Sequence, residues 1–273
     1  MSNPAIRVGI GGWTFEPWRG TFFPDKWPRK RELEYASRAV TAIEVNGTYY
    51  SSFKPATFAG WRDTAPEGFL FAVKASRFCT NRKVLADAGE GIARFVDQGI
   101  VELGDKLGPI LWQFMATKKF DADDFGAFLK LLPASHQGCA LRHAVHVRHE
   151  SFAVPAFVDM ARAAGVAIVF ADSPGYPAIA DITTDFVYAR LEAGEDANET
   201  CYPEENITRW AEAARCWAEG GAPAGLPYVD AALPEKQPRE TFVFMIHGGK
   251  VRAPAGAMAL LDKLGLTPRA AHP

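Results

Sequence analysis

The chain has 273 residues, which suits one (β/α)8 barrel of about 250 residues, although two average domains would also fit this length. Lys and Arg number 30 against 32 Asp and Glu, so the formal net charge is -2, and the isoelectric point lies near 6.3. This balance argues against a nucleic-acid-binding protein, which normally carries a basic excess or a basic stripe. A membrane span would need about 18 consecutive apolar residues, and no such run occurs.

The cysteines and the first residues bear on the compartment. Cys79, Cys139, Cys201 and Cys216 show none of the short spacings of a zinc or redox motif, so we expect reduced thiols. Residues 1–4 lack the basic and apolar regions of a secretory signal. We therefore expect a cytoplasmic protein.

Short apolar runs alternate with amphipathic segments along the chain. We expect eight strands, at residues 6–11, 42–46, 69–74, 109–113, 144–148, 167–172, 186–191 and 241–246. Apolar residues recur at helical spacing in 91–107, 121–132, 155–164, 207–219 and 255–264, which predicts helices there. We expect loops after the second strand, where Tyr49, Tyr50 and Trp61 lie, and at 192–205 and 220–239.

This alternation indicates parallel strands joined by crossover helices. Eight such units favour a closed barrel over an open, doubly wound sheet. The prediction is therefore an α/β protein with a single TIM-type (β/α)8 barrel domain over residues 1–273.

Polar residues occupy one parity of several predicted strands. Since strand side chains alternate between faces, one parity of a barrel strand meets the helices and the other faces the axis. Apolar residues such as Ile43 and Val45 take the outward parity. The inward parity holds Glu44, Asn46, Lys74, His146, Arg148, Tyr188, Arg190 and Glu192, together with Gly9, Gly11 and Trp13.

Eight side chains at or near the C-terminal strand ends are expected to converge on one pocket: Trp13, Glu44, Asn46, Lys74, Gln113, Arg148, Asp172 and Arg190. Barrel enzymes place their active sites at this end. The alternative is a structural ion-pair network that fills the barrel mouth. Three cations with several acids and amides exceed what filling requires, which favours the pocket.

Each candidate has an expected role. Lys74, Arg148 and Arg190 are suited to hold a phosphate or carboxylate. Glu44 is the candidate general acid or base, and its alternative is a salt bridge to Arg148 or Arg190.

Asp172 is a second acid/base candidate, or else a loop anchor or helix cap. Asn46 and Gln113 would orient the substrate. Trp13 and Tyr49 would stack on a ring, or else only pack at the rim.

No metal or other cofactor is predicted. His146, Glu44, Asp172 and His247 could ligate a divalent ion, but the sequence contains no His-x-His or HExxH spacing. The glycines of segment 9–12 lack the third glycine of a dinucleotide fingerprint. No G-x-S-x-G motif supports a serine nucleophile.

Several segments resemble the YecE-like family, known as domain of unknown function 72. They are residues 8–13 (VGIGGW), 18–24 (WRGTFFP), 43–50 (IEVNGTYY), 61–66, 69–74 (FLFAVK), 107–113 (LGPILWQ), 147–152 (VRHESF) and 188–191 (YARL). The matches run in order through nearly the whole chain. The resemblance implies a TIM-type barrel and names no activity, because that of the family is not established.

The chain departs from the family pattern at four places. His146 stands where the resemblance implies an acid, and Phe152 where it implies a tryptophan. Glu192 and Ala193 replace a His-Gly pair, and residues 245–247 replace an Asn-rich ending of the last strand. These departures imply an altered site in this member.

From these observations we expect an enzyme that acts by acid/base chemistry on a small anionic metabolite, such as a phosphorylated or acidic sugar. Hydrolysis, isomerisation and lyase chemistry all remain open, because barrels support each of them. The first alternative is a metabolite-binding protein without catalysis. The second is a metal-dependent protein that processes nucleic acid, against which the charge balance argues.

Overall fold

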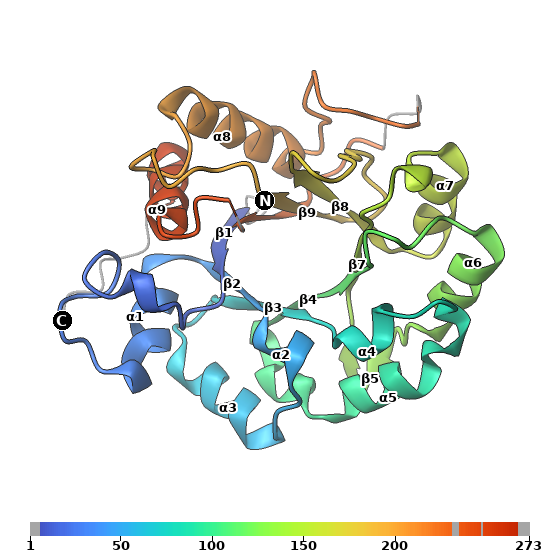
Figure 1. The fold of residues 1–273 in the computed structure, drawn as a ribbon, viewed down its shortest axis with the longest axis horizontal. Coiled ribbons are helices and arrows are strands. Elements are labelled where there is room, and N and C mark those ends of the chain that lie inside the picture. The colour runs from blue at the N-terminus through green and yellow to red at the C-terminus, as the bar shows by residue number, and fades with distance from the viewer. Residues whose placement is uncertain (1–5, 231–234, 247, 267–273) are drawn as a thin grey trace.

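The computed structural model describes residues 6–230, 235–246 and 248–266. Its centre is a closed barrel of parallel strands in the order β1-β10-β9-β8-β7-β4-β3-β2 (Figure 1). The strands are β1 (Ile6–Gly11), β2 (Ala42–Val45), β3 (Leu70–Lys74), β4 (Leu107–Gln113), β7 (His143–His146), β8 (Ala167–Asp172), β9 (Phe186–Leu191) and β10 (Glu240–Met245). This arrangement confirms the predicted TIM-type barrel.

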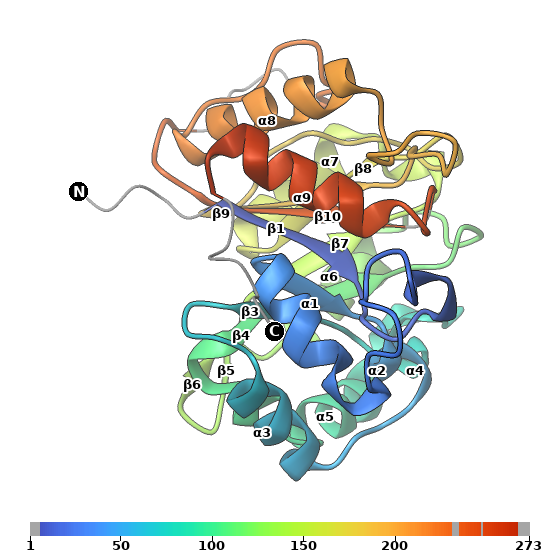
Figure 2. The same ribbon diagram turned by 90° about the vertical axis from the view of Figure 1, so that its left-hand side faces the viewer.

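Helices surround the strands (Figure 1). They are α1 (Glu32–Ala39), α2 (Gly47–Tyr50), α3 (Pro55–Thr64), α4 (Arg77–Thr80), α5 (Gly89–Asp97), α6 (Ala122–Leu131), α7 (Pro155–Ala163), α8 (Glu204–Ala218) and α9 (Ala253–Leu264). In the side view of Figure 2, α8 and α9 lie together against the β1, β9 and β10 side of the barrel. A short antiparallel hairpin of β5 (Ser135–His136) and β6 (Cys139–Ala140) precedes β7.

Local sequence explains where several helices begin. Proline stands in the first turn of α3, α7 and α9, where its missing N–H breaks no helical hydrogen bond. Asp121 caps α6 by accepting a hydrogen bond from the backbone N–H of Asp124 at 2.9 Å. None of the helices in the described part of the chain is long and apolar enough to cross a membrane.

Strand alternation separates the buried apolar side chains into two groups. The outer group fills the layer between strands and helices and includes Val8, Ile43 and Val187. The inner group lies on the barrel axis and consists of Ala42, Leu70, Ala72, Leu111, Ala144, Ala167, Val169, Phe186, Tyr188, Phe242, Phe244 and Ile246. The rings of Tyr188, Phe242 and Phe244 lie with centroids 5.1–6.3 Å apart, so the axis is packed and the cavity above it has a floor.

Two local predictions were wrong. The expected loop after β2 contains α2 and α3, and Trp61 lies within α3. The helix expected at 91–107 ends at Asp97, because Gly99 adopts φ +106, and a 3-10 segment follows at Ile100–Lys106. The hairpin of β5 and β6 was not predicted.

Candidate functional site

A cavity of about 410 Å³ opens among residues at the C-terminal ends of the strands. Six of the nine predicted site residues line it: Asn46, Tyr49, Lys74, Gln113, Arg148 and Arg190. Tyr176 and Glu192, which were not predicted as site residues, line it as well. Lys74 and Gln113 are the last residues of β3 and β4, on the parity that faces the axis.

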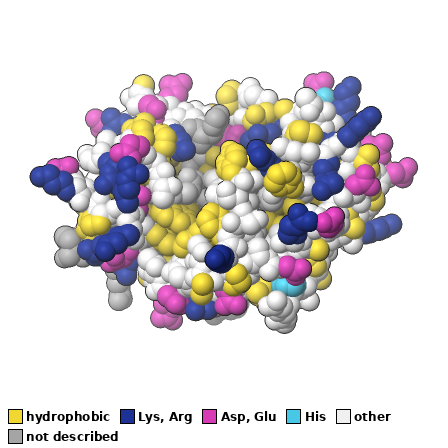
Figure 3. Space-filling view, turned by 60° about the horizontal axis from the view of Figure 1, so that its bottom comes forward, with side chains coloured by type: hydrophobic (Ala, Val, Ile, Leu, Met, Phe, Trp, Pro, Cys, Tyr) yellow, Lys and Arg dark blue, Asp and Glu magenta, His cyan; other side chains and the backbone are white. Residues whose placement is uncertain are grey.

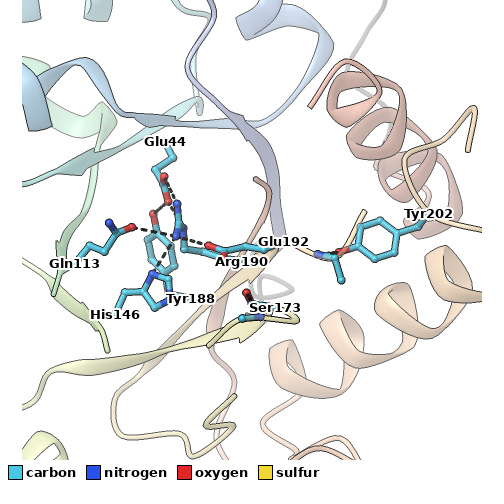
Figure 4. Close-up of polar contacts among 10 residues, drawn as sticks. Glu44, Gln113, His146, Ser173, Tyr188, Arg190, Glu192 and Tyr202 are labelled. Carbon is cyan, nitrogen blue, oxygen red and sulfur yellow. Dashed lines mark hydrogen bonds and ion pairs between the residues drawn. The ribbon is translucent and has the colours of Figure 1, made fainter. Parts of the chain in front are cut away.

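Arg190 is the centre of the polar cluster beneath the cavity (Figure 4). Its Nε and Nη2 donate to Oε2 and Oε1 of Glu44, both at 3.1 Å. Its Nη1 faces three acceptors: Glu192 Oε1 at 2.5 Å, His146 Nδ1 at 2.9 Å and Gln113 Oε1 at 3.3 Å. Arg190, only 2% exposed, is thus held by residues of three other strands, β2, β4 and β7, and by Glu192, which follows its own strand β9.

Glu44 is fully buried, and both of its carboxylate oxygens accept hydrogen bonds. Besides the paired bonds from Arg190, its Oε2 accepts a hydrogen bond from the Tyr188 hydroxyl at 2.7 Å. Burial would raise the pKa of the Glu44 carboxyl, but the charges of Arg190 and Lys74 and the Tyr188 hydrogen bond outweigh it and lower that pKa. The geometry therefore matches the salt bridge to Arg190 that the sequence offered as the alternative for Glu44.

His146 is buried and neutral. A guanidinium can only donate, so Nδ1 of His146 accepts from Arg190 and the ring proton resides on Nε2. Burial, together with Arg190 and Arg148, lowers the pKa of His146 well below its ordinary value. Its Nε2 has no hydrogen-bond partner among the residues that the structure describes.

The side chains of Lys74 and Arg148 differ from that of Arg190 in that neither makes a hydrogen bond or ion pair with any described residue. Each lies instead over a tyrosine ring. Lys74 Nζ is 4.5 Å from the centroid of Tyr49, and the guanidinium carbon of Arg148 is 4.3 Å from that of Tyr176. The two cations therefore line the cavity with their donors unused.

Burial and the charges of Arg190 and Arg148 lower the pKa of Lys74 from 10.5 to about 7, although Glu44 and Glu192 oppose this. The largest cause of this shift is burial, and Lys74 is only 7% exposed. Burial and Arg190 also lower the pKa of Arg148. Lys74 can therefore gain or lose a proton near neutral pH.

Two predicted site residues do not join the cluster. Trp13 packs against Trp61 and Phe71, with ring centroids 5.1 and 6.4 Å away, on the helix side of the barrel. The strand parity that placed it inward ends at Gly12, whose φ of +76 turns the chain. The structure therefore places Trp13 outside the cavity.

Asp172 lies on the outward parity of β8, shared with Phe170. Its Oδ2 accepts a hydrogen bond from the Tyr202 hydroxyl at 2.9 Å. Tyr202 is well apart from the Arg190 cluster in Figure 4. Burial raises the pKa of Asp172, although the Tyr202 hydrogen bond opposes this. Asp172 is not among the residues that line the cavity.

Asn46 and Tyr49 line the cavity, and the side chain of each has a local partner. The Asn46 amide nitrogen donates to the backbone carbonyl of Glu44 at 3.3 Å. The Tyr49 hydroxyl is hydrogen-bonded to the Asn81 side chain, which fixes its ring beneath Lys74.

Three members of the site were not predicted as site residues. The strand parity placed Tyr188 and Glu192 on the inward side with Arg190, where Tyr188 contacts Glu44 and Glu192 contacts Arg190. Tyr176 lies in the segment between β8 and β9, where no periodicity predicts a position.

The metal candidates do not form a ligand set. No group of three His, Cys, Asp or Glu side chains in the described part of the chain could hold a metal ion. Glu44 and His146 both contact Arg190, and Asp172 lies on the other face of its strand. His247 lies outside the described residues.

Residues 7–273 match the family described as Protein of unknown function DUF72. The chain belongs to the DUF72 family. Two solved DUF72 proteins share its fold. TM1631 from Thermotoga maritima MSB8 is 21% identical with a TM-score of 0.68, covering 96% of this chain and 98% of its own. EF0366 from Enterococcus faecalis V583 is 16% identical with a TM-score of 0.71, covering 98% of each chain.

A more distant structure, SacUVDE, is 11% identical with a TM-score of 0.51 and covers 96% of this chain and 99% of its own. Likeness at these identities shows the fold alone. The sequence matches none of the curated proteins. Membership in DUF72 therefore supports the barrel and leaves the activity to be argued from the cavity.

Proposed function

We propose that this DUF72 protein is an enzyme that binds a small anionic metabolite in the cavity and transfers a proton through Lys74. The observation that carries the proposal is the pair of unpartnered cations. Lys74 and Arg148 line the cavity over Tyr49 and Tyr176, and neither has an acceptor among the described residues. Buried charges are normally paired, so an anionic ligand would supply the missing acceptor.

The charge balance of the cluster supports an anion of low charge. Among the described residues, two carboxylates, Glu44 and Glu192, act on Lys74, Arg148 and Arg190. With all five ionised, the cluster carries one excess positive charge. A phosphate or carboxylate group would neutralise that excess.

We assign proton transfer to Lys74, whereas the sequence had indicated Glu44 for that role. A general acid or base works best with a pKa near the operating pH, and that of Lys74 is about 7. Glu44 is fully buried and its pKa is lowered, so its part is to hold Arg190 in place. Asp172 lies outside the cavity and would orient Tyr202.

The cavity geometry favours this proposal over metal-dependent processing of nucleic acid. The likeness to SacUVDE is one of fold, and the described residues offer no metal-ligand cluster. On the face drawn in Figure 3, lysine and arginine side chains are mixed with acidic ones and do not form a continuous basic surface. Nucleic-acid binders usually present such a surface.

A thermal-shift screen against inorganic phosphate, sugar phosphates, sugar acids, nucleotides and divalent metals tests the binding step. A ligand at about a hundred times its Kd should stabilise the protein by roughly 2.7 kcal/mol. Arg148→Ala should remove the stabilisation by anions. Arg77→Ala, which removes an exposed arginine at the start of α4, is the matched control and should retain it.

Stabilisation by no anion, or equal stabilisation of Arg148→Ala and the parent, would refute the anion site. Turnover of a stabilising anion separates an enzyme from a metabolite-binding protein. Lys74→Arg keeps the charge and has a much higher pKa, so it should bind the anion but lose turnover.

A further inference from the structure

We propose that the Lys74 amine attacks the carbonyl carbon of a small anionic aldehyde or ketone and forms an imine with it. The inference rests on the proposed function, because it uses the same cavity and the same anion site. It goes further by naming the reactive atom and the substrate class.

The surroundings of Lys74 leave its nitrogen free to react. A lysine amine that is withdrawn from water normally donates to a carboxylate or to backbone carbonyls, as in the partly buried Lys106, whose Nζ donates to the carbonyls of Arg62 and Ala65 at 2.6 Å. Both carboxylates near Lys74 are instead bonded to Arg190. The Lys74 lone pair is therefore available at the cavity wall once the amine loses its proton.

Lysine nucleophiles are activated by desolvation and by a neighbouring cation. Lys74 has both, since it is buried and the charges of Arg190 and Arg148 disfavour its ammonium form. With a pKa of about 7, about half of Lys74 carries a free amine at neutral pH. An ordinary lysine, with a pKa near 10.4, carries roughly a thousandth of that fraction.

The reaction balances without an oxidant, a reductant or a metal. The Lys74 nitrogen forms a bond to the carbonyl carbon, and the carbonyl π electrons move to oxygen. A proton passes from nitrogen to that oxygen to give a carbinolamine. A second proton, from water in the open cavity, lets the hydroxyl leave as water and produces the iminium ion. The remaining N–H proton then passes to the hydroxide left by that water, which gives the neutral imine and restores the proton balance.

An anionic substrate fits this step better than a neutral one. The iminium ion returns a positive charge to a site that already holds Arg148 and Arg190, which is unfavourable unless the substrate brings a negative group. A carboxylate or phosphate beside the carbonyl would accept hydrogen bonds from Arg148, whose Nε has no partner among the described residues. The Tyr49 ring beneath Nζ would stabilise the iminium cation.

Reductive trapping tests the proposal. The full-length protein is incubated at pH 7 with cyanoborohydride and glyoxylate, a small anionic aldehyde, and the modified lysines are located by peptide mass spectrometry. Pyridoxal 5′-phosphate serves as a second, phosphorylated probe, and propanal as the neutral one. Lys54, which is exposed just before α3, is the internal reference in every digest.

We expect glyoxylate to modify Lys74 at least tenfold faster than Lys54, and propanal to show a smaller preference. Arg148→Ala should reduce the preference for glyoxylate, whereas the rate at Lys54 stays the same. The rate at Lys74 should rise with pH through about 7 as its amine loses the proton. Lys74→Arg, which keeps the charge, should show no adduct at position 74.

Two results would overturn the imine. One is stabilisation of the protein by glyoxylate without preferential modification of Lys74, which leaves the anion site intact. The other is equal rates at Lys74 and Lys54. If no anion stabilises the protein and no adduct forms at Lys74, the proposed function fails together with the imine.

Discussion

Replacing Lys74 with methionine should stabilise the protein. Methionine keeps most of the volume of the side chain and removes an amine that the fold buries without a partner among the described residues. The fall in pKa from 10.5 to about 7 measures how strongly the folded protein disfavours the charged form. At about 1.4 kcal/mol for each tenfold change in proton affinity, that fall corresponds to about 5 kcal/mol.

The expected gain depends on pH in a defined direction. Between pH 7 and 10.5 the unfolded chain binds the Lys74 proton and the folded protein does not, so the stability of the parent rises with pH across that window. The advantage of Lys74→Met should therefore be about 5 kcal/mol at pH 6 and about 2 kcal/mol at pH 9. Loss of the contact with Tyr49 removes about 0.5–1 kcal/mol from each value.

Urea unfolding at pH 6 and pH 9 measures both values. The control is Lys54→Met, an exposed position that should change stability by no more than about 0.5 kcal/mol at either pH. A destabilised Lys74→Met, or a gain that does not change with pH, would show that Lys74 has a stabilising partner. In that event the Lys74 amine is not free to react.

The other predictions concern the buried pair, the barrel wall and the proton of Lys74. Glu44→Gln should cost about 3–5 kcal/mol, since it leaves Arg190 buried with less compensation. Glu240→Gln, between two arginines but partly exposed, should cost at most about 1 kcal/mol, and equal urea midpoints would contradict the difference. Because the pKa of Glu44 is lowered, its contribution should be present above about pH 4.5 and disappear as the pH falls further. Gly9→Ala should severely reduce the yield of folded protein, because its Cβ would lie 2.1 Å from the Ala42 carbonyl oxygen, and a normal circular dichroism spectrum and melting temperature would contradict this. Anion binding at pH 7.5 should take up a proton at Lys74, detected by calorimetry in buffers of different ionisation enthalpy, and a buffer-independent heat would contradict it.

The sequence predicted the barrel well because strand alternation is a local property. The bounds predicted for β1, β8 and β9 agree with the structure, and most of the inward side chains follow from their parity. Strand parity does not predict side-chain direction correctly where a strand ends. Gly12 reverses the direction of Trp13, and Asp172 keeps the outward parity of β8.

The choice of partner between distant strands could not be made from the sequence. The sequence offered Arg148 or Arg190 as the partner of Glu44 and could not decide between them, because Glu44 lies 146 residues from Arg190 in the chain. Arg190 and Glu44 come together only because the strands close into a barrel. Closure of the barrel also leaves Lys74 without a carboxylate. The unpaired Lys74 amine thus results from the pairing of Glu44 and Glu192 with Arg190.

Two of the residues that depart from the family pattern, His146 and Glu192, contact the same atom of Arg190. The resemblance implies an acid at position 146 and a histidine at position 192, whereas this chain has His146 and Glu192. Both contact Nη1 of Arg190, at 2.9 and 2.5 Å. The departures therefore exchange an acid and an imidazole around one guanidinium, which leaves the charge beside it unchanged.

The polar cluster contains residues with partners and residues without them, and the sequence alone does not show which are which. Glu44, Tyr188 and Arg190 satisfy one another, as a structural network would, and they need no ligand. Lys74 and Arg148 are unsatisfied and reduce stability where they stand. A perturbed cation without a carboxylate partner is typical of groups used for binding or chemistry. Under the proposed function, the inner network engages both carboxylates and so leaves these two cations available for an anion.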